Sequence, residues 1–173
     1  MRSSTTSGQT VFELKPLSKE GIEGSVEKAE HYRLLNQPQL AESICLDILL
    51  VEPNNQKTSI ILLLALTDQF ETSSSKANQA FNIARGLKDE YSRAYYSGIV
   101  AERRGAAALK SRALGADFDA YEWYREAMEF FEKADAVSKP DNNDPILRWN
   151  TCARVIMDQH LSERPAESPS YME

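Results

Sequence analysis

The side chains that could do chemistry are few and lie far apart. The chain has two histidines, His31 and His160, and two cysteines, Cys45 and Cys152. A structural zinc site needs four nitrogen, sulfur or oxygen donors at matching spacing, and neither histidine has a suitable second donor three or four residues away. We therefore expect structural or surface histidines and no metal site. Both cysteines fall within apolar helical patterns, where a buried thiol packs as a small hydrophobe.

A row of carboxylates offers a second possible chemistry. Paired acids catalyse proton transfer only in a cleft that shifts their pKa values. Here the acids alternate with apolar and aromatic residues, as on the wet side of an amphipathic helix: Glu122, Glu126, Glu129 and Glu132 among Tyr121, Tyr124, Met128 and Phe131. The sequence also lacks a glycine-rich phosphate loop, a nucleophile elbow and a zinc motif. We therefore expect no catalytic residue, no cofactor and no enzymatic activity.

Composition and charge narrow the class of protein further. The chain of 173 residues carries a net charge of -6, and its only basic pair is Arg103-Arg104, which argues against nucleic-acid binding. The longest apolar run covers residues 60–66, far short of the roughly 20 residues that span a membrane. Residues 1–10 are polar and begin no secretory signal. Together with the low cysteine content, these features predict a cytoplasmic protein that binds neither nucleic acid nor membrane.

The periodicity predicts helices along nearly the whole chain. Apolar residues recur at steps of three and four, and the alternation typical of strands is absent. Proline, asparagine and serine clusters separate the segments. We expect a flexible N-terminal segment over 1–17, a helical domain over 18–161 and a disordered tail over 162–173. The predicted helices cover residues 19–36, 39–51, 57–70, 76–88, 91–113, 118–138 and 145–161.

An internal repeat organises these helices. The first unit carries small and aromatic residues at steps of 3, 9, 4, 3 and 5, namely Ala29, Tyr32, Ala41, Cys45, Ile48 and Pro53. This pattern resembles the tetratricopeptide repeat, a helix-turn-helix unit of about 34 residues. Parts of it return in Ala77, Phe81 and Ala84, in Ala127, Phe131 and Ala134, and in Trp149, Ala153 and Ile156. The resemblance implies an all-α, right-handed α-α superhelix of about three repeats plus a capping helix.

The third unit is longer than the first. From Gly105 to Ala127 the chain uses 22 residues where the first unit uses five, from Asn36 to Ala41. The stretch keeps helical periodicity around a break at Gly115. We interpret it as an extended helical hairpin, with two additional turns on each helix projecting about 12 Å. One arm is rich in alanine and the other in aromatic residues, which favours close packing of small against large side chains.

The family resemblance implies a ligand groove on the first helices of the units. Its positions in this chain combine apolar anchors with arginines: Val26, Arg33, Ile60, Leu64, Tyr95, Ile99, Arg103 and Arg154. We expect a protein-protein interaction module, an adaptor or scaffold, that binds a peptide or helix of a partner protein there. In a competing interpretation the chain's own segment from Val11 to Leu17 fills the groove.

Two other roles stay open at this point. Acidic three-repeat chains of this size resemble secretion-type chaperones, which hold apolar segments of an export substrate in the same groove. Alternatively, the extended hairpin joins two copies into a homodimer through Phe118, Tyr121 and Trp123.

Overall fold

The structure, a computed structural model, describes residues 12–71 and 75–166. Within these ranges it contains α-helices, one short 3-10 helix and no strand, so the prediction of an all-helical chain is confirmed. The elements are η1 (Lys19–Gly21), α1 (Ile22–Leu34), α2 (Pro38–Val51), α3 (Gln56–Thr67), α4 (Ser75–Arg85), α5 (Glu90–Ser111), α6 (Ala116–Ala136) and α7 (Asp144–Asp158). No helix in these ranges is both long and apolar enough to cross a membrane.

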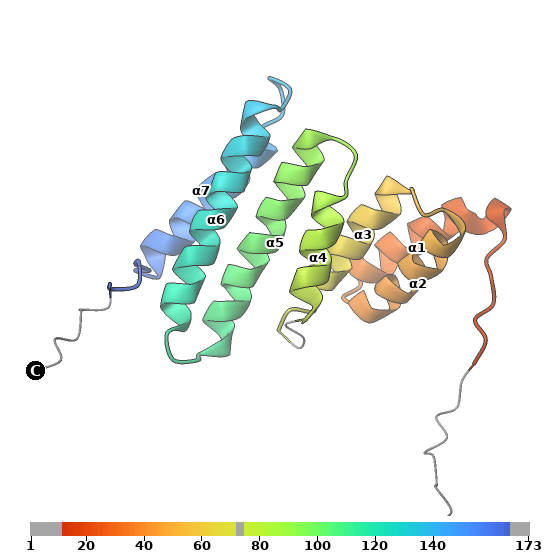
Figure 1. Cartoon of the computed structure of the whole chain (residues 1–173), viewed down its shortest axis with the longest axis horizontal. Helices are drawn as coiled ribbons and strands as arrows, with labels where there is room; N and C mark the ends of the chain where they lie inside the picture. The colour runs from red at the N-terminus through yellow and green to blue at the C-terminus, as the bar shows by residue number, and fades with distance from the viewer. Residues whose placement is uncertain (1–11, 72–74, 167–173) are drawn as a thin grey trace, which may run out of the picture.

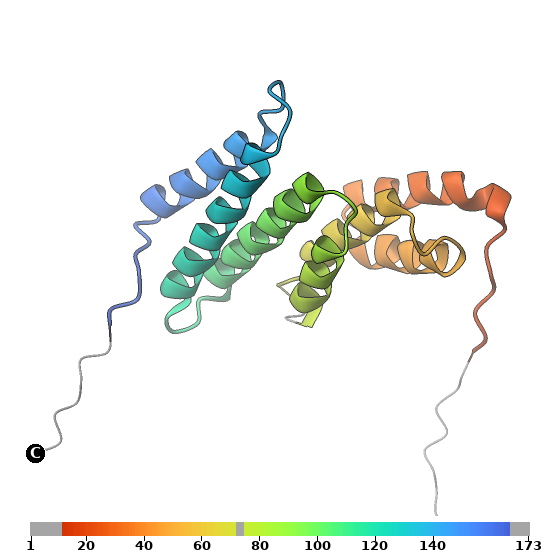
Figure 2. The same ribbon diagram turned by 45° about the horizontal axis from the view of Figure 1, so that its top comes forward.

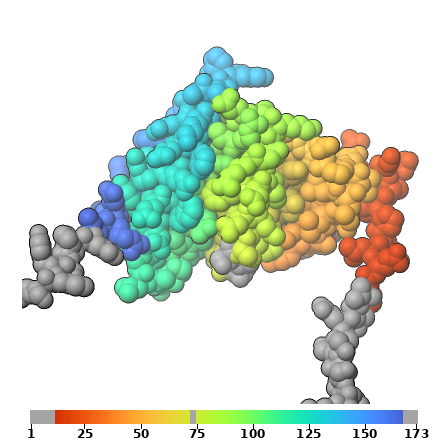
Figure 3. Space-filling model, in the orientation of Figure 1, coloured from red at the N-terminus to blue at the C-terminus, as the bar shows by residue number. Residues whose placement is uncertain are grey.

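The helices form a row in chain order. Each helix packs against the next one along the chain, and α1 also contacts α3, as α3 contacts α5. Figure 1 shows this row with α1 and α7 at opposite ends, and Figure 2 shows the same order after rotation. Neighbouring helices touch along the row in the space-filling view (Figure 3). Packing is therefore local along the chain, as in proteins built of stacked helix pairs.

The first three odd-numbered helices begin at regular intervals. Helices α1, α3 and α5 start at Ile22, Gln56 and Glu90, each 34 residues after the previous start. The side chain of Asn55 accepts the backbone N–H of Thr58 at 3.0 Å, and Asp89 accepts that of Ser92 at 2.8 Å. Both therefore cap a helix whose first N–H groups lack partners within the helix.

Gln56 ties the start of α3 to the start of α5. Its Nε2 donates to Oδ2 of Asp89 at 3.1 Å, and its Oε1 accepts the backbone N–H of Lys88 at 2.8 Å. The two capped ends are thus fixed relative to each other.

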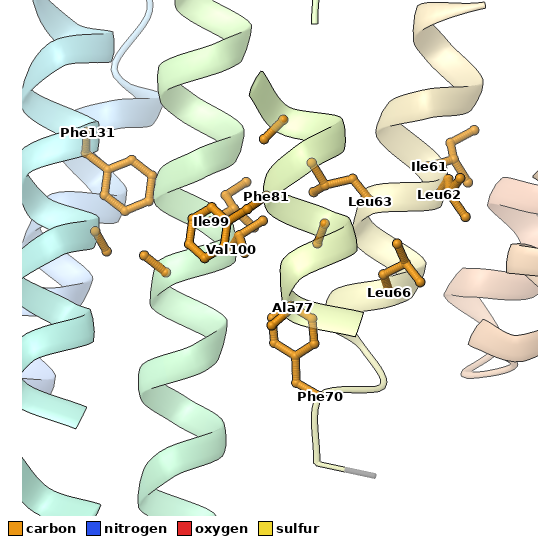
Figure 4. Close-up of a cluster of buried hydrophobic side chains, with 14 of the residues drawn as sticks. Ile61, Leu62, Leu63, Leu66, Phe70, Ala77, Phe81, Ile99, Val100 and Phe131 are labelled. Carbon is orange, nitrogen blue, oxygen red and sulfur yellow. The ribbon is translucent and has the colours of Figure 1, made fainter. Parts of the chain in front are cut away.

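Small side chains line the helix crossings. Ala29, Ala41, Ala84, Ala127 and Ala134 are each 0% exposed. Their size lets neighbouring backbones approach, while larger side chains fill the space between helix pairs. Figure 4 shows such a cluster running from α3 through α4 and α5 to α6, with Leu63, Phe81, Val100 and Phe131.

The two cysteines belong to this core. Cys45 and Cys152 are free and buried. Burial raises the pKa of each thiol to about 12, so both stay protonated at neutral pH. The predicted packing role of both residues fits this environment.

The extended hairpin is present as α5 and α6. These helices have 22 and 21 residues, whereas the others have 11 to 15. The chain reverses through Arg112 and Gly115, whose φ angles of 50° and 80° lie in the left-handed region. Along the hairpin, glycines of α5 face rings of α6. A Cβ on Gly98 would lie 2.6 Å from Cε1 of Phe131, and one on Gly105 would lie 3.0 Å from Cδ2 of Tyr124.

Gly98→Ala is expected to lower the free energy of unfolding by about 1 to 3 kcal/mol, because the new methyl group overpacks a site whose ring is fully buried. Gly24→Ala is the matched control, since a Cβ there meets nothing within 4 Å and alanine is the better helix former. Chemical denaturation should show the two substitutions changing stability in opposite directions. Equal effects would contradict the close packing of α5 on α6.

The two caps provide a second test. Asn55→Ala and Asp89→Ala should each lower the free energy of unfolding by about 1 kcal/mol at pH 7. The N–H of Ser92 holds the pKa of Asp89 below its ordinary value of 3.8, so the Asp89 contribution is complete above pH 3.8 and is lost as the pH falls further. Unfolding curves from pH 7 to pH 2.5 should therefore show the effect of Asp89→Ala shrinking in acid. The effect of Asn55→Ala should stay constant, and a parallel decline of both would refute the assignment.

Candidate interaction groove

One hollow on the odd-numbered helices lies where α1 and α3 end and α5 continues. It measures about 380 Å³. Helix α5 is longer than α3 and extends beyond its C-terminal end. The last turns of α5 therefore form one wall of the hollow, and the C-terminal ends of α1 and α3 form the other. We call this space the hinge-side hollow; its lining residues are Arg33, Leu34, Asn36, Thr67, Asp68, Phe70, Glu71, Arg103, Ala106, Ala107 and Lys110.

Ion pairs occupy two corners of the hinge-side hollow. Nη1 of Arg33 lies 3.1 Å from Oδ2 of Asp68, and Nζ of Lys110 lies 2.5 Å from Oε1 of Glu71. Arg103 also lines the hollow, and it forms no ion pair with any carboxylate of the described residues. The hollow therefore presents one guanidinium that is free to bind an acidic group.

The floor of the hollow is small and apolar. Ala106 and Ala107 leave room above α5, and Phe70, which is 8% exposed, closes the space between α3 and α4. Leu34 stands at the rim and is largely exposed. This arrangement fits an apolar side chain on the floor with an acidic neighbour at Arg103.

The structure brings some of the predicted groove residues together and separates others. Arg33 and Arg103 line the same hollow, as a shared groove requires. Ile60 and Leu64 are half-buried on α3. Val26 and Ile99 belong instead to the core, being 6% and 3% exposed, so neither offers much surface to a ligand. Arg154 is exposed on α7 and does not line this hollow.

The N-terminal segment does not occupy the groove within the described residues. Phe12 and Leu14 are 81% and 72% exposed, and only Leu17 packs against the core. Figure 1 shows the segment leaving the row at the α1 end. Val11 lies outside the described residues. The interpretation in which Val11 to Leu17 fills the groove is therefore wrong for Phe12 and Leu14, whose side chains are exposed to solvent.

Tyr95 faces α7 rather than the hinge-side hollow. Its ring stacks on Tyr91, with centroids 5.4 Å apart, and lies 5.8 Å from the ring of Phe131. Tyr95 also interacts electrostatically with Arg148 of α7, which pairs with Glu102 of α5. Tyr95 therefore helps to hold α7 in place.

Glu102 of α5 also holds α7 in place, through an ion pair with Arg148. Nη1 of Arg148 donates to its two carboxylate oxygens at 3.1 and 3.3 Å. The Glu102 side chain is only 12% exposed. Burial raises the pKa of this carboxyl above its ordinary value, against the pull of Arg148 and Arg103. A buried ion pair of this kind fixes the position of a helix more than it adds net stability.

The aromatic residues of the extended hairpin are already covered within the chain. The ring of Trp123 lies 6.1 Å from that of Phe81, and the guanidinium of Arg104 sits 4.2 Å above it. Arg164 covers Phe118 at 5.3 Å and reaches Oδ1 of Asp119 at 2.5 Å. Tyr121 is likewise half-buried against the core. The homodimer contact through Phe118, Tyr121 and Trp123 stays a prediction, and these side chains have little exposed surface for it.

Sequence reasoning missed a second hollow, which lies between α2 and α4. It measures about 320 Å³, and Leu62 and Leu66 of α3 contribute to its lining together with Leu46 and Ile83. The only signal was a pair of leucines four residues apart, Leu46 and Leu50, turned away from the buried Ala41 face of the same helix. Among the described residues, no group of three or more histidine, cysteine or acidic side chains is placed to hold a metal ion.

Three comparisons with known proteins found no match. No protein-family model, no curated protein and no solved structure matches this chain.

Glu102→Gln is expected to gain stability relative to the unmodified chain as the pH rises from 4 to 7. The folded-state pKa of Glu102 is raised above 4.5, so the native chain loses stability as this carboxyl ionises, and glutamine does not ionise. Urea unfolding at pH 4, 5, 6 and 7 measures the difference. A difference that does not change with pH would show that Glu102 is not desolvated in the folded state.

Proposed function

We propose that this chain is a tetratricopeptide-like superhelix of three helix pairs and a capping helix, and that it acts as a non-catalytic binding module. The 34-residue interval between the starts of α1, α3 and α5 supports the repeat. Further support comes from the alanines at the crossings and from the contacts of α1 with α3 and of α3 with α5. In such a stack the odd-numbered helices line one face.

The observation that carries the proposed function is the hinge-side hollow, with its alanine floor and its unpaired Arg103. Concave sites of several hundred Å³ are the usual form of binding sites, and charged residues, which are common in the lining of this hollow, suit a polar or acidic partner segment rather than a purely apolar ligand. The occupant is a segment of a partner protein, helical or extended, that places an apolar side chain above Ala106 and Ala107 and a carboxylate beside Arg103.

Two further observations support a non-catalytic, cytoplasmic role. The carboxyl with a raised pKa that lies nearest, Glu102, is engaged by Arg148 and does not line the hollow. Both cysteines are free thiols in the core, which suits a reducing compartment.

Selection of peptides from a random 16-residue display library on the full chain tests the proposal. Selected peptides are expected to combine apolar and acidic residues. Arg103→Glu should weaken their binding at least tenfold, because the only free cation of the hollow changes sign. Ala106→Trp should abolish binding by filling the floor. Fluorescence anisotropy with labelled peptides measures both effects.

The control is Leu50→Glu on α2, where the leucine is 73% exposed and lies outside the hollow. This variant should bind as the unmodified chain does. Peptides whose affinity survives Arg103→Glu and Ala106→Trp would place binding elsewhere and refute the proposed site.

A further inference from the structure

A second kind of pocket lies between the end of α6 and the start of α7. It measures about 210 Å³, below the roughly 300 to 1,000 Å³ of sites that hold whole small molecules, so it suits a single side chain. Figure 1 shows the α6–α7 connection at the top of the extended hairpin and the α5–α6 turn at the bottom. We call this space the α6–α7 pocket; its lining residues are Phe131, Glu132, Asp135, Pro145, Ile146 and Trp149.

The interior of the α6–α7 pocket is apolar and aromatic. Phe131 is 0% exposed and Pro145 is buried, so both form its base. Ile146, which is exposed, and Trp149, which is half-buried, line it from α7. The indole of Trp149 is held in place, because its Nε1 donates to Oε1 of Glu132 at 2.9 Å. An aromatic ring fixed in this way can attract a cation to its face.

Two carboxylates stand at the mouth of this pocket. Glu132 and Asp135 are exposed and lie three residues apart, on the same face of α6. In the part of the chain that the structure describes, neither forms an ion pair, and the Asp135 side chain has no hydrogen bond. Oε2 of Glu132 and both carboxylate oxygens of Asp135 are therefore free to accept hydrogen bonds.

The basic side chains nearest in sequence do not neutralise these carboxylates. Nζ of Lys133 lies 5.2 Å from the centre of the Phe130 ring. Arg148 pairs with Glu102 on α5. Lys139, in the α6–α7 connection, has no ion pair with any carboxylate of the described ranges. The pocket therefore has a net negative charge at its mouth.

The ends of the chain are poorly suited to fill the pocket. The sequence after residue 166, ESPSYME, has two glutamates and no lysine or arginine, so its charge opposes entry between two carboxylates. The described N-terminal segment leaves the row at the α1 end, with the other helices between it and the pocket (Figure 1). The charges thus favour a positively charged side chain of another molecule.

We propose that the α6–α7 pocket binds an arginine side chain of a partner protein. The guanidinium lies against the Trp149 ring and donates hydrogen bonds to Glu132 and Asp135. Arginine fits better than lysine, because its planar group stacks on a ring while it donates in its plane to two carboxylates. An ammonium group is more strongly hydrated and gains less from an aromatic wall.

This inference is independent of the function proposed for the hinge-side hollow. The two sites share no lining residue, and they select side chains of opposite charge. Loss of binding at one site should leave the other unchanged, so each proposal can fail alone.

Nuclear magnetic resonance titration of the full chain with the peptide acetyl-Gly-Gly-Arg-Gly-Gly-amide tests the pocket. The chain has two tryptophans, so its indole N–H region contains two signals, and Trp149→Phe identifies the one from Trp149. That signal should shift and saturate with a dissociation constant on the order of 1 mM, as expected for a single side chain. The Trp123 signal should stay in place.

Two altered peptides test the chemistry of recognition. Citrulline in place of arginine keeps the shape of the side chain and removes its charge. The citrulline peptide should bind at least about fivefold more weakly, and the lysine peptide about threefold more weakly.

Three variants of the chain test the carboxylates. Glu132→Gln keeps an oxygen for the indole N–H of Trp149 but removes the charge, and it should weaken binding of the arginine peptide about threefold to fivefold. Asp135→Asn should have a similar effect, and the double variant should show no saturable shift. Glu129→Gln is the matched control, since this exposed carboxylate of α6 does not line the pocket. It should change the affinity less than about twofold. Circular dichroism melting checks that each variant is folded.

Four results would overturn the proposal. The first is a Trp149 signal that shows no saturable shift up to about 20 mM of the arginine peptide, about twenty times the expected dissociation constant. The second is equal binding of the citrulline peptide, which would make the pocket a site for shape without charge. The third is equal binding of the lysine peptide. The fourth is an affinity that survives the double substitution of Glu132 and Asp135.

Discussion

The approach of α5 to α6 is the contact on which the rest of the molecule depends. At Gly98 and Gly105 the α5 backbone lies directly against the rings of Phe131 and Tyr124. These contacts hold the two longest helices together as one hairpin. On one side the hairpin supports α7 through Tyr95, Glu102 and Arg148, and on the other it receives α3 and α4. Because packing is local along the chain, the ends rest on this central unit.

The proposed binding site is a consequence of the same hairpin. Since α5 continues past the end of α3, its last turns have no helix beside them on the α3 side. The hinge-side hollow is the space that remains, and Phe70 closes its base. The alanines of α5 keep the floor open, and the two ion pairs at its corners leave Arg103 as the available charge. The candidate site therefore depends on three features together: the extra length of α5, the small alanine side chains on it, and the ion pairs that leave Arg103 without a partner.

Much of the fold could be predicted because its determinants are local. Apolar spacing and the proline and asparagine breaks placed the seven α-helices of the described residues, with ends that differ from the structure by a few residues. At the first helix the prediction began at residue 19, where the structure has a 3-10 turn before α1. The hairpin followed from counting residues, and its glycine-to-ring packing follows the expected pattern of small against large.

The candidate site was less predictable, because burial and pairing depend on neighbours distant in sequence. Ile99 lies four residues from both Tyr95 and Arg103, yet its side chain is 3% exposed and belongs to the core. Arg33 was predicted as a groove residue from its position alone, and its ion pair with Asp68, which is 35 residues further on, could not be foreseen from helix periodicity. The hollow between α2 and α4 depends on the separation of two helices that do not follow one another. No periodicity within a single helix reports that separation.

Native-state hydrogen exchange, resolved by residue, tests most directly whether the α5–α6 hairpin is the most stable part of the helical row. Amides of α5 and α6 around Gly98, Gly105, Tyr124 and Phe131 should exchange only with the free energy of global unfolding. Amides of α1 and α2, at the end of the row, should exchange through a smaller opening that leaves the hairpin intact. If amides of α5 and α6 exchange faster than those of α1 and α2, the hairpin is not the most stable unit, and the central role of the α5–α6 contact is contradicted.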